Sequence, residues 1–341
     1  MCVTINGRFM TQRVTGVQRY AREVMARDAR LASIVAPRNP ARGLRGHLWE
    51  QSILPARIGR DLLWSPCNTG PLAVTKQVVT IHDCAFYDHP EGFSRKFAAW
   101  YHWLVPKLAR RIRRIITVSK FSCHRLIDFC QVAPEKIVVI PQGVDACFRP
   151  LPADVIAQTR SALGLPPRYV LYVGNLAARK NLPRLLEAWK MVSPAHPDLS
   201  LVLVGAADHV FRDARLGQLP SSVVVAGYVA DEHLPAVYGG AEVFAFPSLY
   251  EGFGLPVLEA MACRTPVMTS NVTSMPEVAG NAALLVDPYS IEAMAEGLHQ
   301  LLTDRVLRES LATQGLERAK SFTWENTARA TWQVLREADS Q

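Results

Sequence analysis

A chain of 341 residues, 49% of them hydrophobic, is long enough for two domains with separate buried cores. It has no run of the roughly 18 apolar residues that would span a bilayer and no signal-peptide pattern at its start, so we expect a cytoplasmic protein. Residues 1–150 carry 23 Lys and Arg against 10 Asp and Glu, a net +13 within a total of +8, which favours an anionic membrane surface or a phosphorylated acceptor as partner; no nucleic-acid-binding motif accompanies this charge.

The cysteines indicate neither a disulfide framework nor a metal site. Their number is odd, and no two of them have the C-x-x-C spacing. We therefore expect them to be small buried hydrophobic residues. The seven are Cys2, Cys67, Cys84, Cys123, Cys130, Cys147 and Cys263.

In the first half of the chain, apolar segments predict a loose alternation of helices and strands. A helix over residues 14–30 begins at Gly16, and a buried strand over 77–83 ends in polar residues. The elements predicted after these are a helix over 95–114, a strand over 114–119, a helix over 120–130 and a strand over 136–145.

The second half repeats an apolar strand, a turn and an amphipathic helix more regularly. The predicted strands cover 168–174, 199–205, 221–229, 242–248, 265–271 and 281–288, and the helices between them cover 182–192, 231–241 and 256–263. This order is typical of an α/β fold with a parallel sheet covered on both faces.

The two halves predict two Rossmann-like domains. Residues 146–155 lack periodicity and contain two prolines, as expected of a linker. We therefore predict a domain over 1–148, a second over 149–322, and a C-terminal helix within 323–341 that returns to the first domain. Because ligands of such sheets bind at the carboxyl ends of the strands, we expect His82 and Gly174 to face a central cleft.

The segment SLYEGFGLPVLEAMACRTPV contains the strongest functional pattern. Glu251 lies in a glycine-rich loop, and Glu259 follows eight residues later inside the next helix. Gly252 and Gly254 allow the backbone to approach a ligand, and a helix N-terminus attracts phosphate. The Glu251 carboxylate suits sugar hydroxyls and that of Glu259 suits ribose hydroxyls, although two glutamates at this spacing alone would indicate only a solvated helix face.

Two cations stand at another helix entrance, in VGNLAARKNLPRLL. Arg179 and Lys180 precede the helix directly, where their charge opposes the positive end of the helix dipole. An anion bound between them would remove this conflict. Diphosphate binding is therefore a better interpretation than an ordinary charged surface.

Two features of the first half are further candidates. In TIHDCAFYDHP, His82 and Asp83 follow a buried strand, where a histidine is suited to polar contact with a reacting sugar or to a purely structural role, and Asp83 is equally suited to cap the loop. In TGVQRYARE, Gly16 opens a helix and suits either a ligand-closing loop or a simple tight turn.

These segments resemble the retaining glycosyltransferases of family 4, the group 1 enzymes of the GT-B fold, whose motif is E-x7-E. The resemblance covers most of the chain and implies a donor nucleotide sugar bound by Gly252, Phe253, Gly254 and Leu255, with Glu251 on the donor sugar. It further implies that Glu259 contacts the ribose. Metal is not required in that family, and no D-x-D motif is present here.

The same resemblance assigns the remaining candidates. Arg179 and Lys180 match the cations that neutralise the leaving diphosphate, although many relatives carry a further Arg where this chain has Asn175. His82 matches a catalytic histidine and Gly16 a loop that closes over the donor. The residues implied near the base are Gly227, Tyr228 and Val229, of which Tyr228 is suited either to stacking or to the core.

The implied reaction is departure of the nucleotide diphosphate and attack by the acceptor hydroxyl on the same face, with a phosphate oxygen as base and no glutamate as covalent nucleophile. INGRFMTQRVTGVQRYA and IHD resemble mannosyl- and rhamnosyltransferases of polysaccharide or O-antigen assembly, which favours a GDP-linked donor and a glycan or lipid-linked acceptor. A nucleotide-sugar epimerase and a non-catalytic sugar-nucleotide-binding relative remain open alternatives. A Rossmann dehydrogenase is disfavoured because no G-x-G-x-x-G follows a strand.

The helix expected over 95–114 combines aromatic and basic residues. Such a surface suits an anionic membrane interface, whereas the alternative is an amphipathic helix with its aromatic side chains in the core. The aromatic residues are Phe97, Trp100, Tyr101 and Trp103, and the basic ones are Arg95, Lys96, Lys107, Arg110, Arg111, Arg113 and Arg114.

Overall fold

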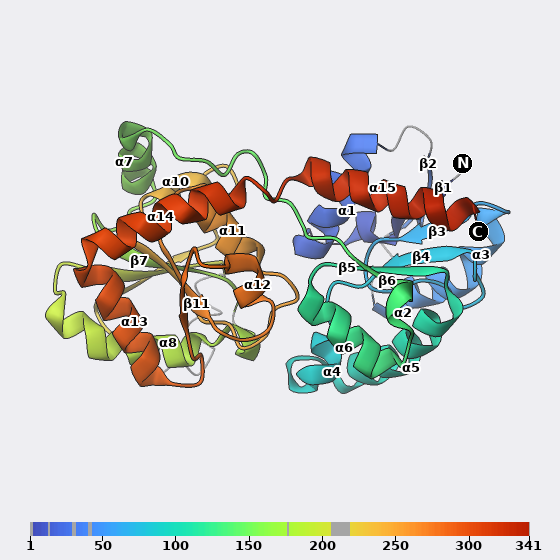
Figure 1. Ribbon diagram of the computed structural model, residues 1–341, viewed down its shortest axis with the longest axis horizontal. Coiled ribbons are helices and arrows are strands. Elements are labelled where there is room, and N and C mark those ends of the chain that lie inside the picture. The colour runs from blue at the N-terminus through green and yellow to red at the C-terminus, as the bar shows by residue number, and fades with distance from the viewer. Residues whose placement is uncertain are drawn as a thin grey trace. The chain divides into compact units, whose positions relative to one another are not determined.

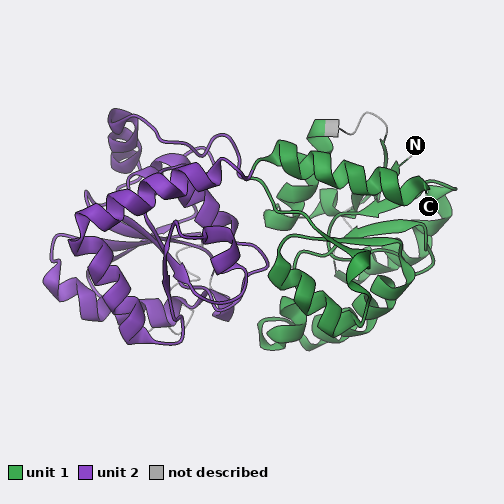
Figure 2. Ribbon diagram, in the orientation of Figure 1, with its two compact units in different colours: residues 1–143, 323–341 green, residues 144–322 purple. Residues whose placement is uncertain are grey.

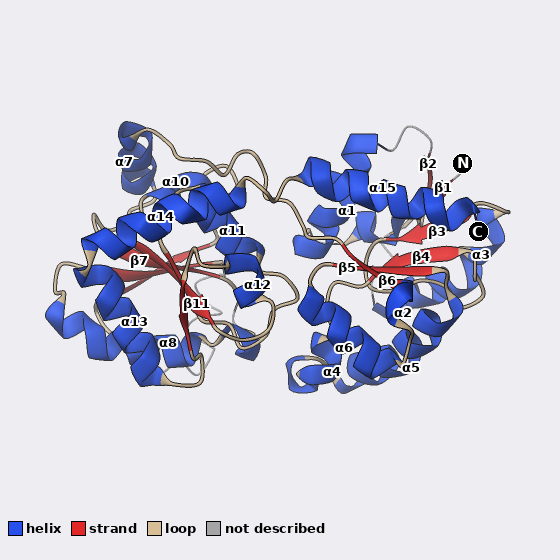
Figure 3. Ribbon diagram, in the orientation of Figure 1, coloured by secondary structure: helices blue, strands red, loops and turns tan. Residues whose placement is uncertain are grey.

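The computed structural model describes residues 3–12, 14–28, 32–39, 43–175, 177–205 and 219–340. Its contacts divide the chain into two compact units, shown in different colours in Figure 2. Unit 1 comprises Met1–Gly143 and Thr323–Gln341, and unit 2 comprises Val144–Phe322. Each unit is an α/β structure with helices around a central sheet (Figure 3), and each is described by itself.

Unit 1 contains a six-stranded parallel sheet in the order β2-β1-β3-β4-β5-β6. Its strands are β1 (Val3–Asn6), β2 (Ala32–Val35), β3 (Leu62–Ser65), β4 (Gln77–Thr80), β5 (Arg114–Thr117) and β6 (Ile137–Val139). Its α-helices are α1 (Gly16–Asp28), α2 (Gly43–Leu48), α3 (Pro55–Ile58), α4 (Ala85–Asp88), α5 (Arg95–Arg111), α6 (Lys120–Cys130) and α15 (Trp324–Ser340).

The two faces of this sheet have separate apolar cores, because side chains alternate along each strand. On β4, Val78 packs with residues of α1 and α15, whereas Val79 packs with residues of α5 and α6. The C-terminal helix α15 lies beside α1 (Figure 1), and the Trp332 indole N–H donates to the Val24 carbonyl at 3.3 Å. The last helix of the chain therefore completes the core of unit 1.

Unit 2 contains a second six-stranded parallel sheet in the order β12-β11-β10-β7-β8-β9. Its strands are β7 (Tyr169–Val173), β8 (Ser200–Val204), β9 (Val223–Gly227), β10 (Val243–Phe246), β11 (Val267–Ser270) and β12 (Leu284–Val286). Its α-helices are α7 (Ala153–Ala162), α8 (Leu182–Val192), α10 (Leu234–Gly239), α11 (Leu255–Ala262), α12 (Met275–Ala279), α13 (Ile291–Thr303) and α14 (Arg305–Ala319). Helices α8 and α13 cover one face of the sheet, α10 and α11 lie on the other, and α14 contacts both α11 and α13 (Figure 1).

The strand order of unit 2 reverses between β7 and β10. The chain proceeds from β7 outward to β8 and β9, then returns to the other side of β7 and continues outward through β10, β11 and β12. In open α/β sheets, the loops at the carboxyl ends of the two strands that flank such a reversal diverge and leave a crevice for a ligand. The loops after β7 and β10 are the two that carry Lys180 and Glu251.

The predicted α/β alternation agrees with the structure, but several boundaries differ. The units divide between Gly143 and Val144 rather than near residue 148, because the Val144 N–H donates to the Phe322 carbonyl and Phe148 packs edge-on against Tyr238 of α10. Helix α5 ends at Arg111, since Ile112 adopts an extended conformation that leads into β5. The sequence did not predict β1, β2 or β3.

The prediction of buried cysteines was wrong for Cys147, which is exposed where its N–H donates to the Asp145 carboxylate in a turn at the start of unit 2. Cys84, Cys130 and Cys263 are buried, and Cys67 and Cys123 are half-buried. No disulfide joins any two of these six, and Cys2 lies outside the described residues.

Candidate functional site

The loops after β7 and β10 of unit 2 are joined directly. The first passes through a short 3₁₀ turn (Ala178–Lys180) into α8, and the second leads into α11. The Leu249 N–H of the second loop donates to the Arg179 carbonyl of the first at 2.7 Å. This bond holds the cationic pair beside the glutamate loop, at the point where the strand order reverses.

A buried ionic cluster occupies this point. Lys180 Nζ lies 2.5 Å from one carboxylate oxygen of Glu251, and Arg179 Nη1 lies 3.3 Å from the other. Lys180 also lies 4.8 Å from the centre of the Phe246 ring. Lys180 and Glu251 are each only 8% exposed, whereas the side chain of Arg179 is 25% exposed, so the lysine meets the carboxylate in a buried site and the arginine lies at its edge.

The environment keeps the Glu251 carboxylate ionised. Burial by itself would raise the pKa of Glu251, but the charges of Lys180 and Arg179 and the hydrogen bond from Lys180 outweigh it, so the pKa lies below its usual range. A carboxylate that remains charged in this way can accept hydrogen bonds from sugar hydroxyls. Because both of its oxygens already face cations, it is a weak nucleophile.

The glutamate loop has a backbone that only glycine suits. Gly254 adopts a φ of +112°, and a Cβ added there would collide with the Met275 side chain. The Ser274 hydroxyl donates to the Glu251 and Phe253 carbonyls, each at 2.9 Å. The loop between β11 and α12 therefore supports the loop that bears Glu251.

The second glutamate of the pair points toward a different partner. Glu259 lies in the second turn of α11, is 8% exposed, and accepts a hydrogen bond from the Tyr238 phenol of α10 at 2.9 Å. Tyr238 is fully buried, so it fixes the carboxylate from the side of the core. The structure thus places Glu251 in the loop and Glu259 in the helix that follows it, as their spacing predicted.

The candidate base-binding residues follow β9. Gly227 has a φ of +70°, Val229 is buried, and Tyr228 is 68% exposed, which excludes the core position considered for this tyrosine. Gly227 also accepts a hydrogen bond from the Gly205 N–H, and a Cβ at Gly205 would meet the Gly174 carbonyl at 2.7 Å. Glycines at the ends of three adjacent strands therefore allow close approach of the backbone there, just before Tyr228.

In unit 1, His82 follows β4 and is 4% exposed. One ring nitrogen, Nε2, donates to the Pro66 carbonyl at 2.9 Å, so Nδ1 accepts from the Gln142 amide at 3.0 Å. Burial is the main reason that the pKa of His82 is lowered, which keeps the ring neutral. Asp83 accepts a hydrogen bond from the Ala85 N–H and so caps the following turn.

Gly16 is the exposed first residue of α1. The Thr15 N–H just before it donates to the Gln18 side chain at 3.1 Å, so the helix start is an ordered turn. His82 and Gly16 lie in unit 1, whereas the Glu251 cluster lies in unit 2. The catalytic roles of His82 and Gly16 stay predictions.

Two residues next to the cluster were not among the candidates from the sequence. Asn181 is 2% exposed, and its amide donates to the Pro247 and Pro288 carbonyls. Ser274 is fully buried below the glutamate loop. The only sequence signal for either was its position directly before a helix, which ordinarily indicates a capping residue.

Neither a metal site nor a membrane-spanning segment is found in the part of the chain that the structure describes. There, no three His, Cys, Asp or Glu side chains are grouped to hold a metal ion. Over the same residues, no helix is both long and apolar enough to cross a bilayer.

Family models match both units. The model described as Glycosyl transferases group 1 matches residues 157–318, and the model described as Glycosyltransferase Family 4 matches residues 63–147. O-antigen chain mannosyltransferase B of Escherichia coli is 33% identical over 268 residues, which cover 76% of this chain and 70% of that protein. Serotype-specific mannosyltransferase WbdA of Escherichia coli is 29% identical over 228 residues, which cover 64% of this chain but only 28% of that protein.

The fold is similar to that of solved glycosyltransferase structures. The structure of HepE from Anabaena in complex with UDP and glucose has a TM-score of 0.78 and 19% identity, over 99% of this chain and all of that one. The likeness confirms the GT-B class, with two Rossmann-like α/β units.

Proposed function

The chain belongs to the group 1 glycosyltransferases of family 4, and on that basis we propose that it transfers mannose, with retention of configuration, from a nucleotide diphosphate to a growing cell-surface polysaccharide. The chain is a glycosyltransferase by family, so the proposal concerns the donor, the acceptor and the chemistry. Both relatives are named as mannosyltransferases, which supports the choice of mannose, and the name O-antigen chain mannosyltransferase B supports a glycan or lipid-linked acceptor.

The observation that carries the proposal is the cluster of Lys180, Arg179 and Glu251 where the strand order reverses. Its two cations contact the loop that leads into α11, and the N-terminus of that helix adds a positive partial charge of its own. A diphosphate placed there would gain stabilisation as negative charge develops on it during departure of the sugar. The two cations thereby stabilise the negative charge of the diphosphate, as a metal ion does in other phosphoryl sites. We therefore propose that no metal or other cofactor is needed.

In the proposed reaction, the bond between the anomeric carbon and the diphosphate oxygen breaks while Lys180 and Arg179 hold the diphosphate. Glu251 accepts hydrogen bonds from the sugar hydroxyls and fixes the ring. The acceptor hydroxyl forms the new bond on the face that the diphosphate leaves, and its proton passes to a phosphate oxygen. Glu251 forms no covalent bond to the sugar, because both of its oxygens are held by cations.

For the nucleotide, we propose GDP. The exposed Tyr228 ring, which directly follows Gly227 at the end of β9, suits stacking on a base. A purine presents a larger stacking area than a pyrimidine. Glu259 is proposed to bind the ribose hydroxyls.

Thermal unfolding in the presence of different nucleotide sugars tests this choice. We expect GDP-mannose to raise the Tm more than UDP-glucose at equal concentration, because a ligand that binds only the folded protein stabilises it in proportion to ln(1 + [L]/Kd), about 2.7 kcal/mol at 100 times Kd. Transfer to a mannose-terminated oligosaccharide, followed by NMR of the new anomeric linkage, tests retention. Greater stabilisation by UDP-glucose, or a product of inverted configuration, would contradict the proposal.

We also propose that helix α5 of unit 1 contacts an anionic membrane. Tyr101 of this helix is buried and Phe97 and Trp100 pack partly into the core, so only Trp103, 46% exposed, is left as a surface aromatic residue. The helix contains no acidic residue. Its exposed cations are Arg95, Lys96, Lys107, Arg110 and Arg111.

Charge reversal on this helix should weaken membrane binding. Near an anionic surface each Lys or Arg contributes about 1 kcal/mol, so we expect Lys107→Glu with Arg111→Glu to lower the affinity for vesicles with 30% phosphatidylglycerol by roughly 30-fold or more. Vesicle co-sedimentation measures this. The control is Lys190→Glu with Lys320→Glu, which changes the net charge by the same amount at exposed positions of unit 2. An equal loss of vesicle affinity in both double variants would show a nonspecific charge effect and contradict the proposal.

A further inference from the structure

Two helices at the donor site begin without side-chain caps, although a capping residue stands at each start. Asn181 precedes α8 and Ser274 precedes α12, and neither side chain accepts a hydrogen bond from a backbone N–H of its own helix. The Asn181 side-chain oxygen instead accepts from the Arg184 guanidinium at 3.0 Å. Ser and Asn are preferred at this position because their side-chain oxygens accept hydrogen bonds from the first-turn N–H groups. Elsewhere in unit 2, Ser290 does so for α13 and Asp304 for α14, at 3.0 and 2.9 Å.

The backbone explains why these two side chains do not cap. A capping residue has extended φ and ψ, as Ser290 has, with φ −97° and ψ 119°. Ser274 is instead helical, at φ −82° and ψ −7°, and it follows Thr273, whose φ of +59° is exceptional for a β-branched residue. Asn181 is itself left-handed, at φ +61°. Neither side chain is therefore placed to accept from the first-turn N–H groups of its helix.

Each side chain instead binds carbonyls of a neighbouring loop. The Ser274 hydroxyl donates to the carbonyls of Glu251 and Phe253, and the neighbouring Met275 packs against Gly254. The Asn181 amide donates to the Pro247 carbonyl after β10 and the Pro288 carbonyl after β12. One side chain therefore holds the loop of Glu251, and the other fixes the residue next to Lys180.

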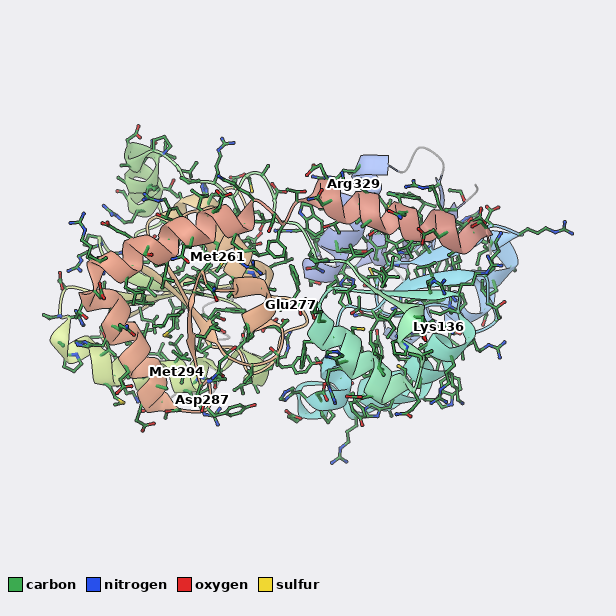
Figure 4. The ribbon with its side chains drawn as sticks, in the orientation of Figure 1. Lys136, Met261, Glu277, Asp287, Met294 and Arg329 are labelled. Carbon is green, nitrogen blue, oxygen red and sulfur yellow. The ribbon has the colours of Figure 1, made fainter. Side chains whose placement is uncertain are left out.

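We propose that Ser274 and Asn181 are positioning residues, whose hydrogen bonds to loop carbonyls hold Glu251 and Lys180 in the geometry that binds the donor. Figure 4 labels Met261 on α11 and Glu277 on α12, the helices on either side of the Ser274 contact. The proposal rests on the proposed function in one respect, since it assumes that the donor binds at the cluster of Lys180, Arg179 and Glu251. Neither residue touches the reacting atoms.

Ser274→Ala and Ser290→Ala form a matched pair, because each removes one hydroxyl from a residue that precedes a helix in the same unit. Ser290→Ala removes a helix cap, so we expect the Tm to fall by about 2–4 °C with kcat unchanged. Ser274→Ala removes no cap but frees the glutamate loop, so we expect kcat to fall by about 10- to 100-fold at 25 °C, with a smaller stabilisation by GDP. Ser274→Thr keeps the hydroxyl and should recover most of the activity.

The outcomes separate the possible failures. If Ser274→Ala retains kcat and GDP stabilisation within twofold of the unmodified enzyme, Ser274 does not position the loop. The same conclusion follows if Ser290→Ala loses as much activity as Ser274→Ala when the two variants lose equally in Tm. Should Ser274→Ala be insoluble, Ser274→Cys, nearly equal in size with a weak donor, should show the same loss in smaller degree, and full activity in it would overturn the proposal. An unmodified enzyme that binds GDP but transfers no sugar would refute the proposed function. The rise in Tm that GDP causes would still test, by comparison of the unmodified enzyme with Ser274→Ala, whether Ser274 positions the loop.

Discussion

Replacing Lys180 with methionine is expected to lower kcat/KM for sugar transfer by about 10³-fold, or about 4 kcal/mol of transition-state stabilisation. Methionine keeps most of the volume beside Phe246 but removes the cation that lies 2.5 Å from Glu251. The leaving diphosphate would then face only Arg179. In addition, the pKa of Glu251 should rise, because burial raises it and the largest opposing charge is gone.

The matched control is Lys190→Met, in the last turn of α8, where the side chain is 47% exposed and paired with Glu187 at the surface. Exposed ion pairs of this kind contribute little, so steady-state kinetics should show kcat/KM within twofold of the unmodified enzyme. Lys180→Arg should recover part of the lost rate, since it restores the charge with a planar, differently shaped donor group. A value for Lys180→Met within tenfold of normal would be incompatible with a diphosphate at this site.

The regular part of the fold could be predicted because unit 2 is built from buried strands that read as continuous apolar runs, such as β7 and β8. The first three strands of unit 1 were harder to predict from the sequence. Strands β1, β2 and β3 have four residues each, and β2 is half-buried to exposed, so neither length nor burial distinguishes it from a loop. Their pairing is set by contacts between distant segments, which local periodicity does not contain.

The same distinction applies to the site. Glu251, Arg179 and Lys180 were predictable because charged residues beside glycines and a helix start conflict with ordinary packing. The roles of Ser274 and Asn181 were not, because they depend on φ values and on which carbonyls lie nearby. A Ser before a helix indicates a cap from sequence alone, and only the left-handed Thr273 before it changes that interpretation.

Replacing Glu251 with glutamine should reduce kcat/KM by about 10²- to 10³-fold and also reveal the charge balance of the site. Glutamine has the shape of the carboxylate, but it leaves Lys180 and Arg179 facing a neutral amide. Removing one member of a buried pair typically costs about 3–5 kcal/mol of stability; we expect about 2 kcal/mol here, since the amide oxygen still accepts a hydrogen bond. Urea unfolding at pH 7 measures this loss. The control is Glu309→Gln at an exposed position, for which we expect no change in the free energy of unfolding.

The pH dependence of that loss distinguishes a charge effect from a packing effect. The folded pKa of Glu251 lies below its ordinary value of 4.5, so the carboxylate binds fewer protons in the folded than in the unfolded protein at moderately acidic pH. Its stabilising contribution is therefore complete above about pH 5 and is lost as the pH falls through 4.5 and then through the folded pKa. The difference in unfolding free energy between the unmodified protein and Glu251→Gln should shrink over that window. A difference that stays constant down to the acid limit of folding would mean that the loss does not depend on the charge of Glu251, which would contradict its charge pairing with Lys180 and Arg179.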